Sequence, residues 1–124
     1  MKIWLITGCS SGIGREIARE VLEKGDNAII TSRKASLEKL QKLTDQYPDR
    51  TLPVELDVTN LESIKEAVKQ GRDYFGKIDV LVNNAGCGYF RTIEEGELEG
   101  VQELFNTNFF GPVCLIKEAR QQLA

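Results

Sequence analysis

Three glycines near the start of the chain are spaced in a way that suits the binding of a phosphate group. Gly8, Gly12 and Gly14 form the pattern G-x3-G-x-G, with Ser10 and Ser11 between them. In a turn from a strand into a helix, glycines let a pyrophosphate reach backbone N–H groups, and the helix N-terminus adds donors and a partial positive charge. The two serine hydroxyls offer further donors to phosphate or ribose. The spacing differs from the usual G-x-G-x-x-G, and a tight turn that binds nothing is the alternative interpretation.

The composition excludes several other chemistries. The 124 residues contain no histidine, which rules out zinc fingers, Ser-His-Asp triads and Cys-His pairs. Cys9, Cys87 and Cys114 are odd in number and lack metal-ligand spacing, so we expect reduced thiols in a cytoplasmic protein and no metal site. A formal net charge of -3 argues against nucleic-acid binding. We expect no membrane segment either, because no apolar run approaches the roughly 18 residues needed to cross a bilayer.

Short apolar runs alternate with segments of helical periodicity along the whole chain. Strands are expected at 3–6, 28–31, 52–58 and 78–82, and the third is expected at a sheet edge because it contains Pro53. This β-α alternation predicts a doubly wound parallel sheet with strand order 3-2-1-4 and helices on both faces. We find no linker or second domain, so residues 1–124 are interpreted as one unit.

The helical segments carry apolar stripes and terminal signals. The expected stripes are Ile13, Ile17, Val21 and Leu22; Leu37, Leu40 and Leu43; Leu61, Ile64 and Val68; and Val101, Leu104, Phe105, Asn108 and Phe109, with Asn108 the one polar residue on an inner face. Thr59 and Glu62 have the spacing of a capping box. Gly25 suits the residue after a helix, Pro48 suits a helix stop, and Pro112 predicts a kink or a new turn.

The motifs together resemble one family, the short-chain dehydrogenase/reductases. The matching residues, in order and spacing, are Thr7-Gly8, Gly12-Ile13-Gly14, Asp57-Val58, Asn83-Asn84-Ala85-Gly86 and Asn108. The resemblance covers the whole of this chain, but it corresponds only to about the first half of the family's domain. It implies a Rossmann-type fold, truncated after the fourth strand, that binds a nicotinamide dinucleotide through Gly8, Ser10, Ser11, Gly12, Ile13 and Gly14.

The resemblance also assigns roles to residues that follow the third and fourth strands. Asp57 and Val58 would flank the adenine ring, with Asp57 accepting a hydrogen bond from its amino group. A carboxylate at the end of the third strand would indeed lie beside the carboxyl end of the first, although Asp57 could instead cap the following helix. Asn84, Ala85 and Gly86 would line the ribose and brace the central strands, whereas Asn83 is interpreted as structural.

The end of the second strand distinguishes between the two nicotinamide cofactors. An acidic residue there would bind the ribose 2′-hydroxyl of NAD. This chain has Ser32 at that position and Arg33 after it. Arg33 could bind a 2′-phosphate, with Ser32 donating a hydrogen bond, so the sequence predicts NADP(H) in preference to NAD(H). A solvent-exposed charge is the alternative for Arg33 and the favoured interpretation of Lys34.

The family's catalytic residues are a serine, an asparagine, a tyrosine and a lysine four residues after the tyrosine. The residues four positions after Tyr47, Tyr74 and Tyr89 are Thr51, Ile78 and Ile93, so none of the three tyrosines fits. Asn108 is the one member of the set that matches, and it could instead tie its helix to a backbone carbonyl. Cys87 and Tyr89 could face a substrate or be ordinary loop residues.

These observations lead to two main hypotheses. The first is the cofactor-binding part of an NADP(H)-dependent oxidoreductase, which would act on a small carbonyl or alcohol substrate only in the complete enzyme and would be inactive by itself. The alternative is a non-catalytic dinucleotide-binding module that self-associates through the exposed edge left after the fourth strand. A signalling or scaffold domain that binds nothing is disfavoured by Asn83-Asn84-Ala85-Gly86.

Overall fold

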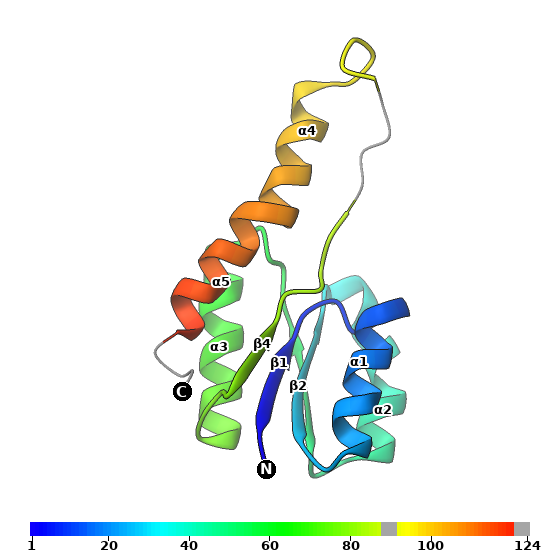
Figure 1. Ribbon diagram of the computed structural model, residues 1–124, viewed down its shortest axis with the longest axis vertical. Coiled ribbons are helices and arrows are strands. Elements are labelled where there is room, and N and C mark those ends of the chain that lie inside the picture. The colour runs from blue at the N-terminus through cyan, green and yellow to red at the C-terminus, as the bar shows by residue number, and fades with distance from the viewer. Residues whose placement is uncertain (88–91, 121–124) are drawn as a thin grey trace.

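The computed structural model describes residues 1–87 and 92–120, and within them the chain forms a four-stranded parallel sheet (Figure 1). Its strands are β1 (Ile3–Ile6), β2 (Asn27–Ser32), β3 (Thr51–Glu55) and β4 (Val80–Val82), in the order β3-β2-β1-β4. The predicted order is therefore confirmed, and Pro53 does lie on an edge strand. The third and fourth strands are shorter than expected, although Leu56 and Ile78 just outside them are buried.

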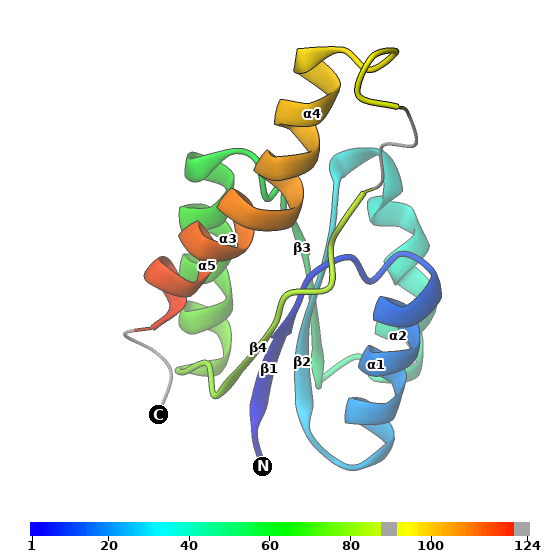
Figure 2. The same ribbon diagram turned by 45° about the horizontal axis from the view of Figure 1, so that its top comes forward.

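Helices cover both faces of the sheet. On one face lie α1 (Gly12–Glu23) and α2 (Gln41–Gln46), the latter preceded by the 3-10 helix η1 (Lys34–Leu40). On the other face lie α3 (Leu61–Phe75) and α5 (Gly111–Ala119), as Figures 1 and 2 both show. Between β4 and α5 come α4 (Leu98–Phe105) and the π-helical segment η2 (Asn106–Phe110), and α4 extends past the carboxyl ends of the strands. No helix in the described residues combines the length and apolar character needed to cross a bilayer.

The alternation of side chains along the strands divides the hydrophobic core between the two faces. In β1, Ile3 and Leu5 pack with residues of α3 and α5, whereas Ile6 packs with residues of α1 and η1. In β2, Ile29 belongs to the first cluster and Ile30 to the second. A strand buried on both faces needs a continuous apolar run, which explains why the sequence located β1 and β2 well.

The start of α3 differs from the expected capping box by one residue. The N-cap is Asn60, whose side-chain oxygen accepts a hydrogen bond from the Ser63 N–H at 3.0 Å. The Thr59 hydroxyl instead donates to the Asp57 carboxylate at 2.6 Å. Both residue types can cap a helix, and the spacing alone did not show which of them has the extended backbone of an N-cap.

The prediction of which side of the last helical segment faces the core is wrong. Val101, Phe105 and Phe109 are 38%, 51% and 55% exposed, and Asn108 is exposed too. The buried residues are Thr107, Gly111, Leu115 and Ala119. The helix runs so close to the core at Gly111 that a Cβ there would lie 2.6 Å from the Val58 carbonyl oxygen, so only glycine fits at this point of contact. The segment η2 interrupts the helix just before Pro112, where the sequence predicted a kink or new turn.

Candidate functional site

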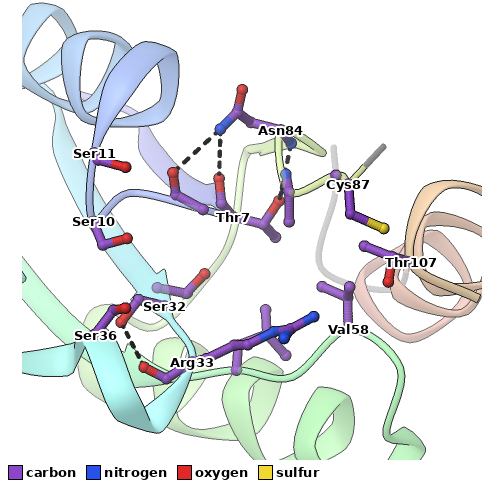
Figure 3. Close-up of a pocket in the computed structure, with 15 residues that line it drawn as sticks. Thr7, Ser10, Ser11, Ser32, Arg33, Ser36, Val58, Asn84, Cys87 and Thr107 are labelled. Carbon is purple, nitrogen blue, oxygen red and sulfur yellow. Dashed lines mark hydrogen bonds between the residues drawn. The ribbon is translucent and has the colours of Figure 1, made fainter. Parts of the chain in front are cut away.

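A cavity of about 380 Å³ opens where the carboxyl ends of the parallel strands meet (Figure 3). Its walls come from five places: the loop after β1, the end of β2 with the start of η1, the segment after β3, the loop after β4, and η2. The residues that line it are Thr7, Gly8, Ser10, Ser11, Thr31, Ser32, Arg33, Ser36, Leu56, Val58, Asn84, Ala85, Gly86, Cys87 and Thr107. Nine of the predicted cofactor residues are among them: Gly8, Ser10, Ser11, Ser32, Arg33, Val58, Asn84, Ala85 and Gly86.

Thr7 joins the ends of β1 and β4 at the base of the cavity. Its buried hydroxyl accepts hydrogen bonds from the N–H groups of Asn84 at 2.9 Å and Ala85 at 2.8 Å. The Asn84 side chain returns the contact by donating to the Thr7 and Gly8 carbonyls, both at 3.2 Å (Figure 3). Thr7 belongs to the Thr7-Gly8 motif but is not among the site residues that the sequence predicts.

The loop after β1 depends on the absence of side chains at Gly8 within it and at Gly14 in the first turn of α1. Gly8 has a φ of +68°, which side chains rarely tolerate. A Cβ at Gly14 would lie 2.0 Å from the Gly8 carbonyl oxygen and 2.5 Å from Nδ2 of Asn84. The Arg15 guanidinium, from the first turn of α1, donates a hydrogen bond to the Ser10 carbonyl in this loop. The first turn of α1 therefore packs directly onto the loop that would hold a pyrophosphate.

Four of the predicted cofactor residues do not line this cavity: Gly12, Ile13, Gly14 and Asp57. Gly12 and Ile13 lie in a separate groove that they share with Trp4 and other residues of α1, and Gly14 packs beneath the loop. Ile13 is 74% exposed, so it does not join the buried stripe predicted for this helix. The stripe begins further along α1, where Ala18, Val21 and Leu22 are buried against the sheet.

Ser32 and Arg33 lie at the carboxyl end of β2. Ser32 is buried, and its hydroxyl donates to the Arg33 carbonyl at 3.0 Å. Arg33 is exposed, and its side chain extends toward Val58 in Figure 3. None of the described residues that line the cavity carries a carboxylate. The cavity therefore offers hydroxyls and one guanidinium to a ligand.

Asp57 borders a second cavity, of about 570 Å³, which shares Arg33, Cys87 and Thr107 with the first. Its carboxylate accepts hydrogen bonds from the Thr59 hydroxyl at 2.6 Å and the Thr59 N–H at 2.9 Å. The hydroxyl bond is the main reason why the pKa of Asp57 lies below its usual value, and the positive charge of Arg33 acts in the same direction. Asp57 thus stabilises the turn before α3, while Asn60 is the N-cap.

Asn108 holds the loop that follows β4. Its side chain accepts from the Cys87 N–H at 2.8 Å and donates to the Cys87 carbonyl at 2.7 Å. Asn108 therefore ties η2 to a loop on the cavity wall, from an exposed position. Cys87 lines the cavity, whereas Tyr89 lies outside the described residues.

The other lining residues include two that no sequence motif marked, Ser36 and Thr107. Ser36 lies between Ala35 and Leu37, and Thr107 lies between two asparagines, so neither position stood out by spacing or residue type. In the part of the chain that the structure describes, no three His, Cys, Asp or Glu side chains gather in a way that could hold a metal ion.

A parallel sheet of this order, with a glycine-containing loop after β1 and a cavity over the strand ends, defines the class of Rossmann-type nucleotide-binding folds. A family model described as short chain dehydrogenase matches residues 2–124. The chain therefore belongs to the short-chain dehydrogenase family.

Individual relatives agree with this assignment. The chain is 39% identical over 117 residues to "Oxidoreductase BOA17" of Botryotinia fuckeliana, covering 94% of this chain and 42% of that protein. Among solved structures, a short-chain dehydrogenase from Streptomyces avermitilis has a TM-score of 0.93 and 39% identity, over 98% of this chain and 45% of that one. A carbonyl reductase from chicken fatty liver, solved with NADPH bound, has a TM-score of 0.89 and 26% identity, over 98% and 52%. The chain spans less than half the length of the first of these relatives.

Proposed function

We propose that this chain is the cofactor-binding part of an NADP(H)-dependent oxidoreductase that transfers hydride between nicotinamide and a carbonyl or alcohol substrate. The observation that carries the proposal is the cavity over the strand ends, which is lined by hydroxyls and Arg33 and, in the described residues, by no carboxylate. A carboxylate at the end of β2 would favour the free ribose hydroxyl of NAD and repel a 2′-phosphate. The NADPH-bound state of the chicken carbonyl reductase supports this choice of cofactor.

The residues present fit such a cofactor part by part. The loop Gly8–Gly14, in which a Cβ at Gly14 would collide with backbone, would receive the pyrophosphate. Asp57 and Val58 would flank the adenine, while Asn84, Ala85 and Gly86 would lie along the ribose. When bound, the nicotinamide would donate or accept the hydride.

Catalysis is proposed for the complete enzyme and not for this chain by itself. Asn108 matches one of the family's catalytic positions, and none of the three tyrosines is followed by a lysine four residues later. The free thiols of Cys9, Cys87 and Cys114 fit a reducing compartment such as the cytoplasm.

Calorimetric titration with NADP⁺ and NAD⁺ tests the proposal. Because a hydrogen bond to a charged group contributes about 1.5–3 kcal/mol, Arg33→Ala should weaken NADP⁺ binding roughly ten- to a hundredfold and leave NAD⁺ binding nearly unchanged. Lys34→Ala is the matched control, because Lys34 is exposed next to Arg33 but does not line the cavity. Equal losses for the two cofactors, or the same loss in both variants, would contradict the proposed role of Arg33.

A self-associating module is the second candidate, and one observation favours it. Helices α4 and α5 and the η2 segment between them expose a row of apolar side chains: Leu98, Val101, Phe105, Phe109, Phe110, Val113 and Ile116. Exposed apolar patches of this extent commonly mark interaction surfaces. This candidate is compatible with cofactor binding, because the row does not line the cavity over the strand ends.

A further inference from the structure

Ser36 belongs to the cavity although no motif pointed to it. It lies in η1, and its N–H donates to the Arg33 carbonyl at 2.9 Å. The side chain is half-buried and lines the cavity with Ser10 and Ser32, as Figure 3 shows. Ser36 and Arg33 therefore come from the same short turn and can reach the same ligand group.

The hydroxyls of Ser32 and Ser36 differ in how they are already used. The Ser32 hydroxyl donates its proton to the Arg33 carbonyl at 3.0 Å, in a position that is 4% exposed. The Ser36 hydroxyl has no hydrogen-bond partner among the described residues and is open to solvent at the cavity wall. A phosphate would have to break the bond made by Ser32, whereas Ser36 would only exchange water for phosphate.

This difference decides which serine gains free energy from binding. A hydroxyl that leaves one protein acceptor for another gains little, because it gives up one hydrogen bond to form the next. A solvated hydroxyl that donates to a charged phosphate gains the full advantage of the charge-assisted bond, and a guanidinium beside it neutralises the remaining phosphate oxygens.

We propose that Ser36, and not Ser32, donates the hydroxyl hydrogen bond to the 2′-phosphate of the cofactor, and so helps Arg33 to select NADP(H). The inference rests on the proposed function, since it assumes that the cavity receives the adenosine end of a dinucleotide. It assigns the buried Ser32 a supporting role, in which its bond to the Arg33 carbonyl holds the turn that presents Arg33 and Ser36.

Titration of the full chain with two nucleotides isolates this contact. The probe 2′,5′-ADP carries the 2′-phosphate, whereas 5′-AMP lacks it. Ser36→Ala should weaken 2′,5′-ADP about tenfold and leave 5′-AMP unchanged, and Ser36→Thr, which keeps the hydroxyl, should retain most of the affinity. Thr44→Ala, which removes a hydroxyl that donates from α2 to the Leu40 carbonyl at the end of η1, is the matched control and should change neither affinity.

Other results of these titrations would overturn the role of Ser36, the proposed function, or both. Equal weakening of both nucleotides by Ser36→Ala would show that Ser36 only shapes the cavity, and would overturn the inference. An unchanged affinity for 2′,5′-ADP would also overturn it, while the proposed function would stand if Arg33→Ala still removed the preference for NADP⁺. Failure of the unaltered chain to bind either nucleotide or NADP⁺ would overturn both. Circular dichroism of each variant establishes that the comparison is made between folded proteins.

Discussion

At the scale of single residues, Asp57 and Thr59 form a small unit beside the cavity. The Thr59 hydroxyl and N–H both donate to the Asp57 carboxylate, and the Asp57 N–H donates to the Ser63 hydroxyl at 2.9 Å. The two bonds from Thr59 stabilise the ionised carboxylate and lower its pKa, with the Thr59 hydroxyl as the largest cause. The same carboxylate can still accept from an adenine amino group, because a carboxylate has about four acceptor positions.

The lowered pKa of Asp57 predicts how stability depends on pH. Because the pKa in the folded state lies below that in the unfolded state, the ionised group stabilises the fold above about pH 4, and this contribution is lost as the pH falls through the folded value. The free energy of urea unfolding, measured at pH 7 and pH 3, should therefore fall less for Asp57→Asn than for the unaltered chain. Asp49→Asn, at an exposed position, is the control; if it changed the pH dependence as much as Asp57→Asn, the interpretation would be wrong.

The cysteines predict a labelling order. Burial raises the pKa of the Cys9 thiol to about 12, whereas Cys87 is exposed on the cavity wall. Since the thiolate is the reactive form, iodoacetamide at pH 8 should modify Cys87 well before Cys9. NADP⁺ should slow the modification of Cys87. Peptide mass spectrometry would show this order. Early modification of Cys9 would contradict its buried position in the loop after β1.

At the scale of elements, the junction of β1, its glycine loop and α1 is the most constrained part of the site. A Cβ at Gly14 would meet backbone, which cannot rotate away, whereas Gly12 has open space around it and a φ of +60°. We expect Gly12→Ala to cost about 1–2 kcal/mol through backbone strain alone. Gly14→Ala should cost more and should also abolish NADP⁺ binding, because α1 must move off the loop.

Urea unfolding and calorimetric titration of the two variants test that order. Comparable losses of stability in Gly12→Ala and Gly14→Ala would mean that the close packing of Gly14 on the Gly8 carbonyl adds nothing to the stability of the fold beyond backbone strain. The two glycines are a suitable pair because both belong to the first turn of α1.

The elements also show how far the sequence could predict the structure. The buried strands and the glycine loop were predictable because an apolar run covered on both faces and a Cβ-free turn leave few alternatives. The orientation of α4 and η2 was not predictable, because apolar periodicity shows that a stripe exists but not which surface it meets. Val101, Phe105 and Phe109 form such a stripe, yet Thr107 and Gly111 face the core. The role proposed for Ser36 depends on a cavity that no local pattern reveals.

At the scale of the whole molecule, the two faces of the sheet are covered but the row of apolar side chains on α4 and α5 is not. If this row is an interaction surface, the chain should associate as its concentration rises, and light scattering would report the mass. Phe105→Lys should shift the chain toward monomer because it places a charge within the row. Tyr74→Lys, at a similarly exposed aromatic position on α3, is the matched control. A monomer at high concentration would count against self-association through this row and through the edge of β4.

Whether the cavity over the strand ends binds a dinucleotide is tested most directly by titrating NADP⁺ into the ¹⁵N-labelled chain and following its backbone amide resonances. The proposed site predicts saturable shifts in three segments that meet at the cavity: 8–11, 32–36 and 84–87. NAD⁺ should perturb the first and third segments more than 32–36, which lies near the 2′-position. Shifts confined to the groove of Trp4 and Ile13, or no shifts at all, would contradict the binding of NADP⁺ in the cavity over the strand ends.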